Sequence, residues 1–302
     1  SEGTVSMGGM VAAVLLSSRT LAPLAQIANL FGRANNAKTS YKRLASFMEE
    51  TKEADQADKN KNAIRKTKLG DLEFKDVAYR YPGADLHTLK DINLTIKEGE
   101  KVAILGRNGS GKSTLMKLAS GLFKASDGLV MYDGVDIRQL HSDDLSNSVG
   151  IVLQDVQLFS GSVKENITMG RKEISQEDLI NSGKLSGLDE FITKIPGGYD
   201  LQLSDGGKGL SGGQRQSIAL SRSLVHKPTH LIFDEPTSAM DMNAESSFIN
   251  QADAILKDST LLIVTHRMPL LNLVDRIIIM NEGQIVEDGS KDEVIKKINP
   301  SS

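Results

Sequence analysis

The amino-acid sequence predicts an α/β protein with a parallel core sheet, a smaller group of antiparallel strands and a helical segment in front of both. Two observations carry this prediction. Short apolar runs such as "KVAIL", "HLIFDE" and "TLLIVTH" lie between segments of helical pattern, which is typical of strands buried in a parallel sheet. Segments such as "LEFKDVAYRY" and "LKDINLTIKEGEKVAIL" alternate apolar and polar residues between turn signals, as antiparallel strands do.

The composition limits the classes of protein to consider. A chain of 302 residues is long enough for one large domain or two ordinary ones, and 39% apolar with 25% charged residues is typical of folded proteins. The net charge of −3 lacks the basic excess of nucleic-acid-binding proteins, so we expect no nucleic-acid partner. Because the chain has no cysteine, disulfide frameworks and cysteine-based zinc sites are excluded.

The apolar stretch near the beginning of the chain allows two interpretations. Residues 10–31 read "MVAAVLLSSRTLAPLAQIANLF", in which Arg19 interrupts the apolar run and Pro23 would kink a helix. A membrane span needs about 20 mostly apolar residues. Taken alone, the stretch therefore favours an amphipathic helix of a soluble domain over a transmembrane helix.

The segment that follows is more polar. Apolar side chains recur at helical spacing up to residue 48, which predicts a helix. Residues 51–68 are almost wholly polar and indicate a linker or a solvated helix. Basic residues outnumber acidic ones between Arg33 and Lys68, a balance found in solvated linkers and also on the cytoplasmic flank of membrane segments.

The segment "LGRNGSGKST" follows the predicted strand "KVAI" and leads into a helical pattern. It matches the phosphate-binding pattern G-x-x-x-x-G-K-[ST] in the strand–loop–helix context that this motif requires. Glycines let successive backbone N–H groups face the phosphates, Lys112 adds a positive charge, and the Ser113 hydroxyl can bind Mg²⁺. The residues expected to bind nucleotide here are Gly106, Arg107, Asn108, Gly109, Ser110, Gly111, Lys112, Ser113 and Thr114.

Two carboxylates stand at the end of the apolar strand in "HLIFDEP". Asp234 and Glu235 would lie at the carboxyl end of that strand, where parallel sheets hold their functional sites. We expect Asp234 to hold Mg²⁺ through water, and Glu235 to orient and deprotonate the attacking water.

A second anion site is predicted by "LSGGQRQSIALSRSL". A Ser-Gly-Gly turn that opens a helix presents backbone N–H groups to an anion. The chain already has one phosphate loop, so a second site is explained if it serves the nucleotide of another copy. The residues concerned are Ser211, Gly212, Gly213 and Gln214.

In this order and spacing, "GRNGSGKST", "LSGGQRQ" and "LIFDEPTSAMD" resemble the nucleotide-binding domain of ATP-binding cassette (ABC) transporters, over roughly residues 70–298. The resemblance implies a P-loop NTPase fold, namely the ABC ATPase fold, with an antiparallel β subdomain and a helical subdomain that carries "LSGGQ". It also implies ATP and Mg²⁺ as ligands, and a second nucleotide-binding domain as partner in a homodimer. All catalytic positions of the family are present, so the resemblance implies an active ATPase.

The resemblance also implies roles for residues outside the three motifs. Tyr81 in "YRYPG" matches the aromatic residue that stacks on adenine, with Tyr79 as a nearby competitor. Gln154 matches the glutamine that contacts Mg²⁺, His266 the switch histidine, and Asp241 the loop after the catalytic strand. The implied catalytic residues are thus Lys112, Gln154, Glu235 and His266, and the implied metal ligands are Ser113, Gln154 and Asp234. The remaining histidines, which we expect to be structural, are His87, His141, His226 and His230.

Three classes of protein share this ATPase: exporters, soluble ATPase subunits of importers, and ABC proteins without a transport function. The long apolar and basic segment before the ATPase favours the exporter. On this interpretation, residues 1–50 are the C-terminal remnant of a transmembrane domain, with residues 6–31 as most of its last membrane helix. Residues 51–68 are a linker and residues 69–302 the ATPase domain.

A finer resemblance, to type I secretion and bacteriocin or toxin export ATPases, rests on "SMGGMVAAVLLSSRTLAPLAQI" and "DGGKGLSGGQRQ". It implies an ATPase on the cytoplasmic side of the inner or plasma membrane. The implied partners are the transmembrane domains of the same polypeptide and accessory secretion proteins.

Overall fold

The computed structural model of the chain describes residues 6–58 and 63–298. By internal contacts the chain divides into two units, Ser1–Lys61 and Asn62–Ser302. The predicted segments 1–50, 51–68 and 69–302 each lie partly outside the described residues. The parts outside are residues 1–5, 59–62 and 299–302.

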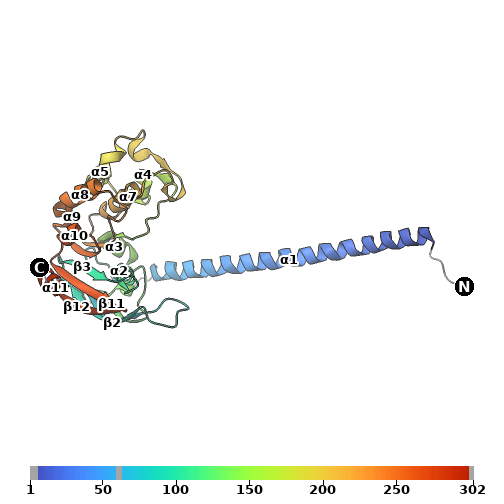
Figure 1. The fold of residues 1–302 in the computed structure, drawn as a ribbon, viewed down its shortest axis with the longest axis horizontal. Helices are drawn as coiled ribbons and strands as arrows, with labels where there is room; N and C mark the ends of the chain where they lie inside the picture. The colour runs from blue at the N-terminus through green and yellow to red at the C-terminus, as the bar shows by residue number, and fades with distance from the viewer. Residues whose placement is uncertain (1–5, 59–62, 299–302) are drawn as a thin grey trace. The chain divides into compact units, whose positions relative to one another are not determined.

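In its described part, the first unit forms one helix, α1 (Met7–Asp58), which Figure 1 shows in blue. It runs past residue 50 into the expected linker, because the Ala, Glu, Gln and Lys residues there favour helix. Pro23 lies inside α1. Large apolar side chains such as Val14, Leu15 and Phe31 are exposed.

Along the described parts of the chain, no helix is both long enough and apolar enough to cross a membrane. This finding differs from the membrane helix expected in residues 6–31, where Ser17, Ser18 and Arg19 interrupt the apolar run. The assignment of residues 1–50 to a transmembrane domain stays a prediction.

The second unit is built on a six-stranded sheet with the order β12-β11-β3-β10-β9-β6. Its strands are β3 (Lys101–Gly106), β6 (Val149–Val152), β9 (His230–Asp234), β10 (Thr260–Val264), β11 (Arg276–Asn281) and β12 (Gln284–Ser290). All pairs are parallel except β11 with β12. Every residue of β9 and β10 is buried, which confirms that these apolar runs form central strands.

A second sheet of four antiparallel strands has the order β2-β1-β4-β5. Its strands are β1 (Leu72–Tyr79), β2 (Leu89–Ile96), β4 (Asp127–Tyr132) and β5 (Val135–Asp136). Alternate residues such as Leu72 and Phe74 point into the core, so the antiparallel strands predicted from alternation are confirmed. A cluster of buried apolar residues joins this sheet, helix α2 (Lys112–Ala119) and the core sheet.

A group of helices forms the third part of this unit, and Figure 1 shows α4, α5 and α7 together at one end of it. Leu158, Ile167, Leu179 and Ile218 belong to its own apolar cluster. The elements are α4 (Val163–Thr168), α5 (Gln176–Leu185), α6 (Asp189–Ile192), α7 (Gly212–Leu224) and a small sheet of β7 (Gly161–Ser162) and β8 (Gln202–Leu203).

The remaining helices lie before β6, between β9 and β11, and after β12. They are α3 (Ser142–Ser148), α8 (Met242–Asn250), α9 (Ala252–Leu256), α10 (Met268–Leu271) and α11 (Lys291–Ile298). Side chains from α7, α8, α9 and α10 pack with the core sheet in a further apolar cluster. The fold thus has the parallel core, antiparallel sheet, helical group and leading helix that the sequence predicts.

Residues 63–68 of the expected linker are attached to the second unit. The Arg65 guanidinium donates to both oxygens of Asp144 at 2.8 and 2.9 Å, and the backbone N–H of Lys66 donates to Asp144 at 2.8 Å. Ile64 forms an isolated bridge with Leu140. Because the Asp144 side chain is buried, these charge-assisted bonds fix the path by which the chain enters the domain.

His230, at the start of β9, lies in the core with 2% of its surface exposed. Its ring packs edge-on against Tyr132 with centroids 5.0 Å apart, and its Nδ1 lies 3.0 Å from the Thr229 hydroxyl. Burial lowers the pKa of His230 from 6.5 to about 4, although the nearby Asp133 carboxylate acts in the opposite direction. The structure therefore supports the structural role expected for this histidine.

We expect this buried histidine to make the fold sensitive to acid. Between pH 6.5 and about 4, the unfolded chain binds a proton at His230 that the folded chain does not bind. The free energy of unfolding therefore falls as the pH falls through this window. Between about pH 7.5 and about pH 5, urea unfolding should show the wild type losing about 2 kcal/mol more than the His230→Gln variant. An equal loss in both proteins would contradict the assignment.

Candidate active site

The predicted catalytic residues meet because three neighbouring parallel strands end side by side. The phosphate-binding loop follows β3, Asp234 ends β9 and Glu235 follows it, and His266 lies just beyond β10. Strand β10 pairs with both β3 and β9, and the Glu235 N–H donates to the Val264 carbonyl at 2.9 Å. The carboxyl ends of parallel strands share one edge of the sheet, and this edge carries the site.

The loop from Gly106 to Thr114 wraps around the Lys112 side chain. The Lys112 ammonium donates to the carbonyls of Gly106 and Arg107 at 2.7 and 3.0 Å. Gly111 has a φ of 100°, which an L side chain rarely adopts, and immediately precedes α2. A Cβ at Gly106 would collide with the Met280 carbonyl. The two glycines therefore allow the loop to lie close to β11 and to turn into α2, whose first N–H groups have no partner within the helix and suit a phosphate.

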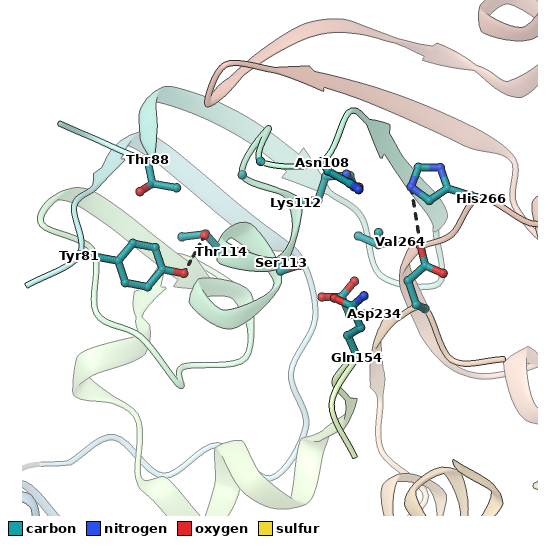
Figure 2. Close-up of a pocket in the computed structure, with 13 residues that line it drawn as sticks. Tyr81, Thr88, Asn108, Lys112, Ser113, Thr114, Gln154, Asp234, Val264 and His266 are labelled. Atoms are coloured by element: carbon teal, nitrogen blue, oxygen red, sulfur yellow. Dashed lines mark hydrogen bonds and ion pairs between the residues drawn. The ribbon is translucent and has the colours of Figure 1, made fainter. Parts of the chain in front are cut away.

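A cavity of about 410 Å³ opens over this loop, which is within the range of nucleotide-sized ligand sites. Figure 2 shows its lining residues. The lining residues that the sequence predicts are Tyr81, Asn108, Gly109, Gly111, Lys112, Ser113, Thr114, Gln154, Asp234, Glu235 and His266. Gly106, Arg107 and Ser110 belong to the loop but not to the described lining, and Ser110 is buried.

Two further residues line the cavity, Thr88 and Val264. Thr88 is placed by a backbone bond, since its N–H donates to the Tyr79 carbonyl at 2.7 Å. Val264 ends β10 beside Asp234. Neither belongs to a motif, and a threonine before a strand or a valine within one gives no sequence signal for a binding site.

Burial shifts the pKa values of two charged residues that line the cavity, Asp234 and Lys112. Burial raises the pKa of Asp234 above its ordinary value, although a hydrogen bond from Ser113 and the charge of Lys112 oppose this. Burial likewise lowers the pKa of Lys112, against the attraction of Asp234 and Glu235. The Lys112 ammonium and the Asp234 and Glu235 carboxylates thus lie in a cavity that is partly shielded from water. Their electrostatic interactions with a ligand are stronger there than in bulk water.

Glu235 and His266 form a pair at the edge of the cavity. The His266 Nε2 lies 3.7 Å from Glu235 Oε1, as the dashed line in Figure 2 shows. Glu235 has a φ of +56°, an uncommon conformation for a residue with a side chain. Such strain persists only where the surrounding contacts impose it, and it is concentrated at functional sites.

The structure distinguishes between the two candidate tyrosines. Tyr81 lines the cavity, is 37% exposed, and its hydroxyl lies 3.2 Å from the Thr114 hydroxyl. Tyr79 is buried and stacks on Phe123 with ring centroids 5.2 Å apart. Tyr81 also packs edge-on against both of these rings, so the buried Tyr79 supports the accessible Tyr81.

The residues present fit a magnesium ion shared with a nucleotide. Ser113 and Asp234 line the same cavity, where the Ser113 hydroxyl acts to lower the pKa of Asp234, and Gln154 reaches this cavity from the segment after β6. In the described parts of the chain, no cluster of three or more His, Asp or Glu residues could hold a metal alone. The Ser113, Gln154 and Asp234 side chains supply oxygens of the kind that Mg²⁺ prefers, and Mg²⁺ is usually bound by few protein oxygens together with phosphates and water.

The Ser211–Gln214 turn opens α7, as the sequence predicts. The Ser211 hydroxyl accepts from the Gln214 N–H at 3.2 Å, and the Gln214 side chain accepts from the Ser211 N–H at 2.9 Å. The turn lines a second cavity of about 410 Å³, together with Gly187, Glu190, Phe191, Lys194, Ser217, Ala239, Asp241, Asn243 and Ala244.

Asp241 belongs to this second cavity and is absent from the described lining of the first. Its carboxylate accepts from the Ala244 N–H at 2.9 Å and so caps α8. The resemblance implies that Asp241 and the Ser211–Gln214 turn both bind nucleotide, and the structure places them beside one cavity, apart from the phosphate-binding loop. Their role in nucleotide binding stays a prediction.

One buried side chain connects the two cavities. Gln216 of α7 is 1% exposed, its amide donates to the Glu235 carbonyl at 2.9 Å, and its carbonyl accepts from the Ala239 N–H at 2.9 Å. A Cβ at Gly212 would lie 3.0 Å from Ala239 Cβ. The small residues of the turn thus also allow α7 to approach the loop that follows β9.

Comparisons with known proteins agree with this geometry. Residues 89–238 match the family described as "ABC transporter". The chain is 37% identical over 298 residues to the toxin RTX-I translocation ATP-binding protein of Actinobacillus pleuropneumoniae, which covers 99% of this chain and 42% of that protein. It is 37% identical over 296 residues to the exotoxin translocation ATP-binding protein PaxB of Pasteurella aerogenes, a match that covers 98% of this chain and 41% of that protein.

A solved structure is also similar. A bacterial Atm1-family ABC exporter with ATP bound matches 76% of this chain and 40% of the exporter chain, with a TM-score of 0.71 and 30% identity. The chain therefore spans about two fifths of the length of the proteins to which it is similar.

Proposed function

We propose that this chain, which carries a domain of the ABC transporter family, hydrolyses ATP as one half of a head-to-tail dimer. One observation carries the proposal: the phosphate-binding loop and the Ser211–Gln214 turn line two separate cavities. Neither cavity, within the described chain, contains both sets of groups. A second copy in a symmetric dimer would bring its turn to the loop of the first and complete both sites.

In this dimer each residue near the nucleotide has a distinct role. Tyr81 would stack on adenine, and the loop N–H groups with Lys112 would hold the phosphates. Ser211 of the second copy and the start of its α7 would face the γ-phosphate. ATP then binds the dimer more tightly than the single chain, and this difference in affinity closes the dimer.

Ser113, Asp234 and Gln154 would hold Mg²⁺, which supplies charge neutralisation at the phosphate oxygens. Glu235 would accept a proton from the attacking water as the water oxygen bonds to the γ-phosphorus and the bond to ADP breaks. His266, which pairs with Glu235 at the edge of the cavity, would hold Glu235 and the γ-phosphate in the geometry that the attack requires. Loss of the γ-phosphate then removes the contact that joins the two copies.

For the whole protein we propose export of a protein or peptide toxin, or a similar substrate, across the inner or plasma membrane. The names of the relatives with high coverage support this. Residues 1–50 would be the C-terminal part of the transmembrane domain, where polar residues are tolerated if they face other helices or an aqueous pathway. The ATPase would lie on the cytoplasmic side, with accessory secretion proteins as further partners.

Complementation between two inactive variants tests the shared sites. Lys112→Ala removes a group from the loop, and Ser211→Arg blocks the turn, so each alone should lack steady-state ATP hydrolysis. Mixed in equal amounts, they should recover up to about a quarter of wild-type activity, because half of random dimers are mixed and each has one complete site.

The dimer proposal would be wrong if Ser211→Arg hydrolysed ATP normally, or if wild-type activity per chain did not rise with protein concentration. If the mixture recovered no hydrolysis and also formed no ATP-dependent dimers, with each variant folded, the two groups would not act across an interface.

A further inference from the structure

A buried carboxylate outside the cavity contacts both loops that carry the proposed catalytic pair. Glu245 lies on α8 with 8% of its surface exposed. One of its oxygens accepts from the Thr237 hydroxyl at 2.6 Å, and the other accepts from the Arg267 guanidinium at 2.8 Å. A buried charge is costly unless it is paired and hydrogen-bonded, and here both oxygens have partners.

The two partners belong to different loops. Thr237 follows Glu235 by two residues and is fully buried. Arg267 directly follows His266, and its guanidinium also donates to the Ser238 carbonyl at 3.2 Å. Its backbone N–H donates to the Thr265 hydroxyl at 3.0 Å. Glu245 therefore joins the loop after β9 to the loop after β10 at a point next to each catalytic side chain.

The strands end before the catalytic side chains, so the loops that follow the strands place these side chains. The last backbone bond between the two strand ends is that from the Glu235 N–H to the Val264 carbonyl. Beyond it, the 3.7 Å separation of Glu235 and His266 depends on contacts made by the loops. We propose that Glu245 is a positioning residue that fixes this separation through Thr237 and Arg267. The inference rests on the proposed ATPase function, in which Glu235 and His266 act together.

The expected effect is on the rate of hydrolysis and not on nucleotide binding. Glu245 does not line the nucleotide cavity, so Glu245→Ala should leave the KM for ATP within about twofold of wild type. Its kcat should fall about 10- to 100-fold, because misplacement of catalytic groups by about 1 Å has effects of this size. Glu245→Gln keeps a side-chain oxygen for hydrogen bonds from Thr237 or Arg267 and should recover part of the loss.

A double-mutant cycle with His266→Ala separates positioning from a general loss of structure. If Glu245 acts by placing Glu235 against His266, then Glu245→Ala should cost less than about twofold in kcat when His266 is already absent. A purely structural role would cost the same factor in both backgrounds and would overturn the proposal. An unchanged kcat in the single variant, or a raised KM with unchanged kcat, would also overturn it.

Two further variants complete the design. Arg267→Gln breaks the same connection from its partly exposed end, so it should reproduce the loss of kcat even if Glu245→Ala folds poorly. Asp288→Asn is the matched control, because Asp288 pairs with Arg276 through two 2.6 Å bonds between β11 and β12, outside the described cavity lining. Its kcat should match wild type.

The same measurements separate failure of this inference from failure of the proposed function. If the wild-type protein did not hydrolyse ATP, the proposed function would be wrong. If kcat fell in Glu235→Gln but not in the Glu245 variants, the proposed function would stand and the role of Glu245 would be rejected.

Discussion

ATP hydrolysis by the Glu235→Gln variant is expected to fall by about 10²- to 10⁴-fold, the usual contribution of a positioned general base. Glutamine has nearly the same size as glutamate but cannot accept a proton from water. The backbone bond from residue 235 to Val264 and the bond from Gln216 to the carbonyl of residue 235 do not involve the side chain. The site should therefore keep its geometry while it loses the base.

Because nucleotide binding does not require the base, the variant should retain ATP and accumulate as an ATP-bound dimer. Gel filtration with and without Mg-ATP measures this, alongside steady-state hydrolysis. Glu282→Gln is a matched control, since Glu282 is exposed in the turn between β11 and β12 and also has a positive φ of 48°. Hydrolysis by Glu235→Gln near the wild-type rate would exclude Glu235 as the base.

Nucleotide affinity should fall by about 10²-fold in Lys112→Ala, because hydrogen bonds to a charged group are each worth about 1.5–3 kcal/mol and the ammonium can donate more than one. In this structure the Lys112 ammonium is held by the carbonyls of Gly106 and Arg107, at the point where the loop curls. The Lys112 side chain is buried, so its charge is already partly stripped of water, and this burial lowers its pKa. The charge is thus prepared to interact with phosphate.

Equilibrium binding of a fluorescent ATP analogue to Lys112→Ala, compared with wild type, measures the affinity. Lys124→Ala is the control, because Lys124 is exposed on the segment after α2 and lies outside the described cavity lining. Wild-type affinity in Lys112→Ala would show that the loop binds nucleotide through its backbone alone.

The phosphate-binding loop could be predicted from the sequence because all of its chemistry is local. The loop from Gly106 to Thr114 is contiguous, and the strand and helix on either side are indicated by their own patterns. The meeting of Lys112 and Asp234 could also be predicted, since parallel strands end at one edge of a sheet, whereas the role of His266 was predicted from the resemblance. Tyr81 and Gln154 were predicted from the resemblance alone, and they line the same cavity.

Gln216 and Glu245 could not be identified in this way. Each lies on a helix, where glutamine and glutamate are ordinary solvent-facing residues. Gln216 ends the motif "LSGGQRQ", but the motif does not show which backbone groups its side chain contacts, and Glu245 lies outside the quoted motifs. Their importance comes from contacts with loops that leave other strands, such as the bond from Gln216 to Ala239 and that from Arg267 to Glu245. These contacts depend on how the loops turn beyond the strands, which local patterns do not specify.

The leading helix shows a different limit. Helix formation over α1 follows from local propensity and is confirmed by the structure. Whether such a helix enters a membrane depends on its surroundings, because Arg19 and Pro23 are unfavourable against lipid but tolerated in a protein-lined pathway. Sequence patterning therefore specifies the helix but not its environment.

The two hydrogen bonds of Gln216 have a consequence for communication between subunits. The helix that would touch the neighbour's nucleotide is fastened, through this one amide, to the backbone of the chain's own general base. In the proposed dimer, each subunit would therefore register the occupancy of its neighbour's site as a shift in its own Glu235. The two nucleotides would be hydrolysed cooperatively, and no signal from the membrane would be needed for one site to respond to the other.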